Sequence, residues 1–200
     1  MNEISREQLP EIGAPLAGGY YTGIVQSGDK QFAIITSPKS LQLIGRWGKY
    51  GERIEGCNSV NDCAANTKAM AEAGSEIAIN VLSIEHDGFK DWLIPSRDVV
   101  ELQYRHFKPT EEENYCSFRD GDNPSSVPPG HLYTDENPLQ TSIENFKDGN
   151  PEAFDDGWYW SSTQYSAFTA YFQAFESGHQ YYCVKDLELR VRPVRRLVIC

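Results

Sequence analysis

Residues 91–96 read Asp-Trp-Leu-Ile-Pro-Ser and mark the start of the clearest helix in the chain. The side chain of Ser96 is of the kind that accepts a hydrogen bond from an unpaired backbone N–H in a first helical turn. Asp98 lies in that turn, where the helix dipole favours a negative charge. Together these features predict a helix over residues 97–107.

A second helix is predicted upstream, over residues 66–82. Its apolar residues recur every three or four positions, at Met70, Ala73, Ile77 and Val81. This spacing is typical of a helix with one buried stripe. The preceding residues 39–63 are rich in glycine and keep no persistent period, which predicts a loop-rich connection.

Strand patterns occupy both ends of the chain. Residues 20–25 and 32–36 flank a Ser-Gly-Asp turn and predict a hairpin. Strands at both ends with two helices between them predict an α+β fold whose N- and C-terminal strands pair. A chain of 200 residues suffices for one substantial core, so we expect one domain over residues 1–200. The later β-rich runs are residues 158–163, 168–176, 180–184 and 187–199.

The connection over residues 110–157, which we call the acidic segment, carries most of the charge. It contains twelve acidic residues and two basic ones, a net charge of −10 out of −11 for the whole chain. Its composition shifts to Pro, Gly, Asn, Asp, Glu and Ser. Connections of this length are usually functional or disordered, so we expect a loop excursion from the domain.

Charge and hydropathy argue against several classes of function. A net charge of −11 repels phosphate backbones, which argues against nucleic acid as a partner. No apolar run reaches the ~20 residues that a membrane helix needs, and the chain does not begin with a signal-peptide pattern. We therefore expect a protein that is made in the cytoplasm and does not insert into a membrane.

Common catalytic motifs are missing. The sequence has no H-E-x-x-H, G-x-S-x-G or G-x-G-x-x-G motif, and its four histidines are scattered. We therefore expect a protein that is not an enzyme. An enzyme that uses carboxylates of the acidic segment stays open as an alternative.

Five cysteines cannot all pair within one chain, and none forms a close C-x-x-C pair. Free thiols are one interpretation. The other is a disulfide between Cys57 and Cys63, which bracket a short polar loop that such a bond would close in an oxidising compartment.

Aromatic residues in and near the C-terminal hairpins are the candidate ligand-binding residues. Alternation along a strand puts Tyr171 and Phe172 on opposite faces, so some of these rings must point away from the core. Exposed tyrosines anchor sugar and protein recognition because they give a large contact area at low entropic cost. The alternative is that the rings pack beneath the acidic segment. The candidates are Tyr165, Phe168, Tyr171, Tyr181 and Tyr182.

Carboxylates of the acidic segment are the candidate metal ligands. Ca²⁺ takes six to eight oxygens from carboxylates, amides and carbonyls. A solvated acidic loop without a cation is the alternative, and no other cofactor is expected. The predicted Ca²⁺ ligands are Asp120, Asp122, Asp135 and Glu136.

Five short blocks, in order along the chain, carry a resemblance to a known family. They are Gly18-Gly19, Asn66-Thr67, residues 91–96, Tyr-Trp-Ser-Ser-Thr at residues 159–163 and Val-Arg-Pro-Val-Arg-Arg at residues 191–196. Over nearly its whole length the chain resembles the Lcl C-terminal-domain family of bacteria and phages, which is related in fold to C-type-lectin-like and formylglycine-generating-enzyme domains. The resemblance implies paired terminal strands, two helices beside a small sheet, and a ligand face formed by the long loop region.

The blocks themselves look structural. Trp92 and Trp160 would be core aromatics with satisfied indole N–H groups, and Arg192 and Arg195 would bond to backbone carbonyls or carboxylates. The Glu-Pro-Asn calcium triplet of the lectins is absent, and so is a reactive cysteine pair with a supporting motif. The resemblance therefore does not extend to calcium-dependent sugar binding or to oxidase chemistry.

These observations favour a receptor-recognition protein, either a virion component at a phage tail tip or fibre or a bacterial adhesion protein. Its expected partners are a cell-surface glycan or protein, or other virion proteins. We expect a homo-oligomer, since avidity raises the affinity of weak single sites. The alternative from another class is an intracellular phage-encoded inhibitor whose acidic segment binds a basic host protein.

Overall fold

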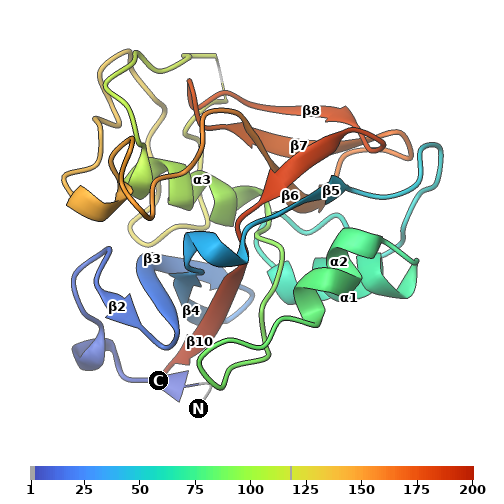
Figure 1. Cartoon of the computed structure of the whole chain (residues 1–200), viewed down its shortest axis with the longest axis horizontal. Coiled ribbons are helices and arrows are strands. Elements are labelled where there is room, and N and C mark those ends of the chain that lie inside the picture. The colour runs from blue at the N-terminus through green and yellow to red at the C-terminus, as the bar shows by residue number, and fades with distance from the viewer. Residues whose placement is uncertain (1–2, 118) are drawn as a thin grey trace.

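Two β-sheets of five strands organise the chain in the computed structural model, which describes residues 3–117 and 119–200 (Figure 1). The first sheet has the strand order β1-β10-β4-β3-β2. Its strands are β1 (Glu3–Ile4), β2 (Pro15–Leu16), β3 (Gly19–Ser27), β4 (Lys30–Thr36) and β10 (Val194–Ile199). The second sheet has the order β5-β9-β6-β7-β8. Its strands are β5 (Leu43–Arg46), β6 (Trp158–Gln164), β7 (Thr169–Ala174), β8 (Gln180–Val184) and β9 (Glu188–Val191).

The helices confirm the predicted α+β class. Within the described residues they are α1 (Cys63–Glu72), α2 (Glu76–Leu82) and α3 (Arg97–Phe107), with 3-10 turns at Arg6–Gln8, Lys39–Leu41 and Glu144–Phe146. α1 and α2 lie together beside the second sheet, whereas α3 contacts strands of both sheets (Figure 1). No helix in residues 3–117 or 119–200 is long and apolar enough to cross a membrane.

The predicted N-terminal hairpin and the pairing of the chain ends are confirmed. β3 and β4 pair antiparallel around the predicted turn. β10 pairs antiparallel with β4 and parallel with β1, so the last strand lies between two N-terminal strands. A bulge in β3 includes Gly23, whose φ is +135° and where a Cβ atom would lie 3.2 Å from Leu102. The glycine therefore lets β3 pack closely on α3.

Two details of the strand pattern go beyond the prediction. The β-rich run over residues 187–199 is confirmed, but it is divided between β9 and β10, which belong to different sheets. Pro193 lies between them and has no N–H to continue a ladder of hydrogen bonds. The connection over residues 39–63 is loop-rich as predicted, and it also contains the short strand β5, which pairs with β9. β5 is too short to be predicted from alternation in the sequence: it has only four residues, of which Leu43 and Gly45 are half-buried.

The predicted helix over residues 66–82 is two helices. α1 ends and α2 begins on either side of Gly74, whose φ is +84°. A glycine in this conformation closes the last turn of the preceding helix. Of the predicted apolar stripe, Ala73 is exposed and the buried members are Met70, Ile77 and Val81.

α3 spans the predicted residues 97–107, but the side chain of Ser96 does not cap it. The N–H of Arg97 donates instead to Thr163 Oγ1 of β6, at 2.9 Å. Ser96 Oγ accepts a hydrogen bond from Cys63 Sγ of α1, at 3.4 Å. The start of α3 is therefore fixed by tertiary contacts with β6 and α1.

Trp92 and Trp160 are fully buried in the core beneath the second sheet, as predicted. Trp160 Nε1 donates to Gly45 O at 3.1 Å. Trp92 Nε1 has no hydrogen-bond partner within the described residues, which corrects the prediction for that side chain. The Arg195 guanidinium lies 5.8 Å from the Trp92 ring centre and makes a cation–π contact with the ring.

The two buried arginines bond as predicted. Arg192 Nε donates to Ser37 O at 2.7 Å, and its Nη2 lies 2.6 Å from a carboxylate oxygen of Glu152. Arg195 binds both carboxylate oxygens of Asp91, at 2.5 and 3.1 Å. These pairs connect β10 and the residues before it to the acidic segment and to the stretch that opens α3.

All five cysteines are free thiols, so no disulfide closes the loop between Cys57 and Cys63. Both of these thiols are buried, and Cys57 Sγ donates to Asn66 O at 3.3 Å. Burial raises the pKa of Cys57 to about 11, which keeps the thiol protonated at neutral pH.

The acidic segment is packed against the domain and is not a free excursion. Phe146 stacks on Phe107 of α3 with ring centroids 4.0 Å apart, and Phe154 stacks on Phe175 at 4.1 Å. Tyr133 is buried in the same cluster. Apolar side chains that are isolated in the sequence thus anchor this segment on α3 and on the residue that follows β7.

Candidate functional site

Four of the five predicted ligand-binding aromatics lie together at the outer surface of β7 and β8. Tyr171 and Tyr182 are cross-strand partners. Phe172 is buried whereas Tyr171 is half-buried, which confirms that the two residues face opposite sides of the sheet. The four are Tyr165, Tyr171, Tyr181 and Tyr182.

Three of these tyrosines and one histidine stack into what we call the tyrosine column. Tyr165 stacks on Tyr182 with ring centroids 3.9 Å apart and planes within 6°. Tyr182 stacks on Tyr181 at 4.3 Å and 17°. Tyr181 stacks in turn on His179 at 5.4 Å and 19°. The column therefore runs in the order Tyr165, Tyr182, Tyr181, His179.

Other side chains meet the column from its sides. Tyr171 is edge-on to Tyr165, with centroids 5.5 Å apart at 84°, and Tyr115 is edge-on to His179 at 4.4 Å. Edge-to-face contacts are favoured because a positive ring edge meets a negative ring face. The Arg97 guanidinium lies 5.9 Å from the Tyr171 ring centre.

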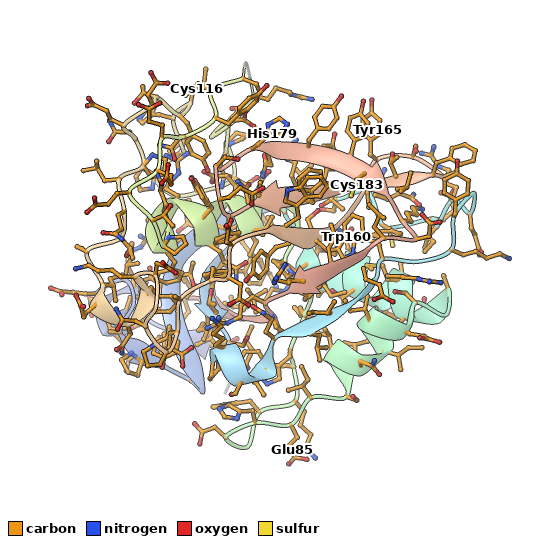
Figure 2. All side chains as sticks on the ribbon, turned by 45° about the horizontal axis from the view of Figure 1, so that its top comes forward. Glu85, Cys116, Trp160, Tyr165, His179 and Cys183 are labelled. Carbon is orange, nitrogen blue, oxygen red and sulfur yellow. The ribbon has the colours of Figure 1, made fainter. Side chains whose placement is uncertain are left out.

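The column reaches the surface of the molecule. Tyr165 and Tyr181 are 49% and 48% exposed. In Figure 2, Tyr165 and His179 are labelled in the upper part of the view, above Trp160. Tyr165 and Tyr181 therefore do not pack beneath the acidic segment.

The phenol groups of the column contact one another. Tyr181 Oη donates to Tyr182 Oη at 3.4 Å. The pKa of Tyr182 is raised by the hydrogen bonds that its hydroxyl makes with those of Tyr181 and Tyr165, and by the nearness of both phenols, which disfavours a negative charge there. The hydroxyls of the three tyrosines thus lie at the same side of the stack.

Asp120, one of the predicted metal ligands, holds the end of the column in place. It is fully buried, and its two carboxylate oxygens accept hydrogen bonds from Gln180 N at 2.8 Å and from Ser117 N at 3.0 Å. His179 Nδ1 lies 3.2 Å from the same carboxylate. Asp120 therefore connects the acidic segment to the first residue of β8.

The other three predicted metal ligands lie on the surface in two places. Asp122 lies beside Arg97 and Tyr171, whereas Asp135 and Glu136 line a separate hollow of about 400 Å³. In the part of the chain that the structure describes, no three His, Cys, Asp or Glu side chains form a group that could hold a metal ion. Calcium binding by these residues stays a prediction.

Phe168 lies apart from the column. Its ring contacts Tyr50, with centroids 5.1 Å apart, at the turn between β6 and β7. Tyr50 also borders a groove of about 550 Å³ between β5, the start of α2 and the turn before β9. Four of the five predicted aromatics thus lie together, and Phe168 forms a separate ring pair with Tyr50.

Three residues of this surface are missed by sequence reasoning. His179 stands two positions before Tyr181, and its place next to a strand was the one available signal. Tyr115 comes from the acidic segment and Arg97 from α3, and only tertiary packing brings them to the column.

Function has to be inferred from the tyrosine column itself. No protein-family model matches the chain, and no curated protein matches it in sequence. The column offers a stack of preassembled rings, a row of phenol hydroxyls, and the Asp120 contact that holds His179 and Gln180 in place.

Proposed function

We propose that this protein is a non-enzymatic recognition module that binds a cell-surface receptor, a glycan or a protein, through the tyrosine column. The observation that carries this proposal is the preassembled stack of Tyr165, Tyr182, Tyr181 and His179 at the surface of β7 and β8. Rings that are already ordered lose little conformational entropy on binding, so more of the contact energy remains as affinity.

The shape of the surface supports recognition over catalysis. The hollow next to the column, bordered by Arg97, Asp122, Tyr171 and Gln180, has a volume of about 20 Å³. Sites for small molecules usually measure roughly 300–1,000 Å³. A surface without a larger hollow suits the side of an extended partner, and it offers no enclosure for a small substrate.

We further propose a C-type-lectin-like fold and membership of the Lcl C-terminal-domain family. The positions of the resembling blocks support this: residues 91–96 open α3, residues 159–163 lie on β6, and Arg192 and Arg195 make buried bonds. In this setting the protein would act as a homo-oligomer in a phage tail tip or fibre, or as a bacterial adhesion protein. Several copies of one modest surface would raise the total affinity by avidity.

A second candidate function uses the acidic segment. Carboxylates around the hollow of about 400 Å³ form a negative surface with the exposed Leu139 beside it. This surface supports binding to a basic host protein. Salt-sensitive co-purification with such a protein would favour this second function. The carboxylates are Glu111, Glu113, Asp135 and Glu136.

The test of the first proposal is binding to intact bacterial cells and to an array of bacterial surface polysaccharides. Combining Tyr165→Ala with Tyr181→Ala should weaken binding by roughly 30-fold or more, the effect of losing one interface hot spot of ~2 kcal/mol. Tyr50→Ala removes an equally exposed ring outside the column and should leave binding unchanged.

Two results would overturn the proposal. One is wild-type binding that the double variant retains in full while its melting temperature is unchanged. The other is turnover of a small substrate by the purified chain, because that would make the protein an enzyme.

A further inference from the structure

We infer that the tyrosine column recognises a polyhydroxylated chain, a glycan, edge-on through its row of phenol hydroxyls and not through the faces of its rings. The inference rests on the proposed function and names the ligand class and the atoms that bind it. It follows from which parts of each ring are already occupied.

The ring faces are largely used within the column. Tyr182 lies between Tyr165 and Tyr181, with centroid distances of 3.9 and 4.3 Å, so both of its faces are covered. Tyr181 has Tyr182 on one face and His179 on the other. A ligand that stacked on either ring would first have to separate rings that are in contact.

Two further rings border the column from its sides. Tyr171 stands edge-on beside both Tyr165 and Tyr182, with centroids 5.5 and 6.2 Å away, and Tyr115 stands edge-on to His179. Tyr165 and Tyr181 are nevertheless about half exposed. Because both faces of Tyr181 are in contact, the area that it exposes is made of its ring edge and hydroxyl group.

The hydroxyl row has bonding capacity to spare. A phenol hydroxyl has one hydrogen to donate and also accepts, and the bond between the Tyr181 and Tyr182 hydroxyls is long at 3.4 Å. A ligand whose closely spaced groups both donate and accept would make better hydrogen bonds with these hydroxyls than the hydroxyls make with one another. Neighbouring hydroxyls of a glycan have that property.

Polar groups beside the column match the same ligand. Arg97, Asp122 and Gln180 border the small hollow next to Tyr171. A donor, an acceptor and an amide beside a phenol row extend the hydrogen-bonding surface toward α3. A protein partner would instead gain most from broad aromatic faces filling its pockets, and both faces of Tyr181 and Tyr182 are already in contact within the stack.

The experiment compares hydroxyl removal with ring removal. The triple variant Tyr165→Phe, Tyr181→Phe, Tyr182→Phe keeps every ring and deletes the three hydroxyls. It should bind polysaccharide arrays and intact bacterial cells at least about tenfold more weakly than wild type, since each lost hydrogen bond costs on the order of 1 kcal/mol. Tyr50→Phe is the matched control and should bind as wild type does, and melting curves establish that all variants fold.

Treatment of the cells identifies the source of the ligand. Periodate breaks the carbon–carbon bond between neighbouring hydroxyl-bearing carbons of glycans and converts both hydroxyls to carbonyls, whereas a protease removes surface proteins. We expect periodate to abolish wild-type binding and protease to leave it intact.

The possible failures are distinguishable. Wild-type protein that binds no cell and no polysaccharide would overturn the proposed function and this inference with it. Binding that survives in the phenylalanine triple variant, or that protease abolishes and periodate does not, would overturn the hydroxyl-row inference while the recognition function stands.

Discussion

Lys185 carries a buried charge beneath the loop that follows β5. Its Nζ donates to Glu52 O at 2.7 Å and to Gln164 Oε1 at 2.5 Å, and it lies 4.5 Å from the centre of the Trp47 ring. Burial lowers the pKa of Lys185 from 10.5 to about 8, because the charged form loses its hydration. Single residues of this kind link the protonation of the protein to its stability.

The contribution of Lys185 to folding stability should rise with pH in alkali, where proteins usually lose stability. Between pH 8 and 10.5 the unfolded chain keeps a proton on Lys185 that the folded chain has released, so folding stability rises with pH in this window. The free energy of unfolding of wild type, minus that of Lys185→Met, should increase by on the order of 2 kcal/mol from pH 8 to pH 10. Denaturant titrations at both pH values measure it, and a constant or falling difference would contradict the assignment.

Asp120 gives a second prediction at the scale of single residues, on the free energy of unfolding. Asp120→Ala leaves the N–H groups of Gln180 and Ser117 without their acceptor and should lower the free energy of unfolding by about 1–3 kcal/mol. Asp122→Ala, two positions on and exposed, should change it by less than about 0.5 kcal/mol. Urea titration gives both values, and hydrogen exchange at the Gln180 amide should accelerate only in the first variant. Equal effects of the two substitutions would show that Asp120 does not brace β8.

At the scale of secondary-structure elements, local patterns predict some boundaries and miss others for physical reasons. α3 and the β3–β4 hairpin follow from signals within each stretch. The break between α1 and α2 does not, because the apolar spacing from Met70 to Val81 continues across Gly74. The division of residues 187–199 between two sheets depends on partners that are distant in sequence, and a pattern of alternation does not contain them.

Gly74 tests the helix break. Its φ of +84° is strained for any residue with a Cβ atom, although the space around it is open. Gly74→Ala should therefore destabilise the protein by about 1 kcal/mol through backbone conformation alone. Gly48→Ala is the control, because Gly48 has no such φ and its nearest neighbour would lie 3.9 Å from the new Cβ. A thermal or urea melt in which both variants match wild type would contradict the helix-closing role of Gly74.

Phe146 tests whether the acidic segment is an integral part of the core. Its ring is fully buried, stacked on Phe107 and edge-on to Tyr20. Phe146→Ala should cost about 3–5 kcal/mol, the range for buried aromatic truncations. Leu139→Ala, in the same segment but 69% exposed, should cost less than about 0.5 kcal/mol. A mild effect of Phe146→Ala in urea titrations would mean that the segment is an appendage.

At the scale of the whole molecule, the second sheet and its turns supply the tyrosine column, and the acidic segment and α3 border it. The sequence allowed its three tyrosines and the neighbouring Tyr171 to be proposed, because alternation in β7 requires some rings to point outward. Their stacking order, the inclusion of His179 and the brace from Asp120 could not be predicted, since these depend on how the acidic segment returns to the start of β8. The acidic segment thus contributes to this surface as a support, through Tyr115 and Asp120, more than as a free charged loop.

Hydroxyl-radical footprinting of the wild-type chain, free and bound to the cells or polysaccharide that it recognises, shows directly whether the receptor binds at the tyrosine column. Mass spectrometry then reports the oxidation of each exposed tyrosine and leucine. Binding should protect Tyr165 and Tyr181, while Tyr50 and Leu139 should be oxidised equally in both states. Protection at Tyr50 or Leu139, with Tyr165 and Tyr181 unchanged, would contradict this prediction.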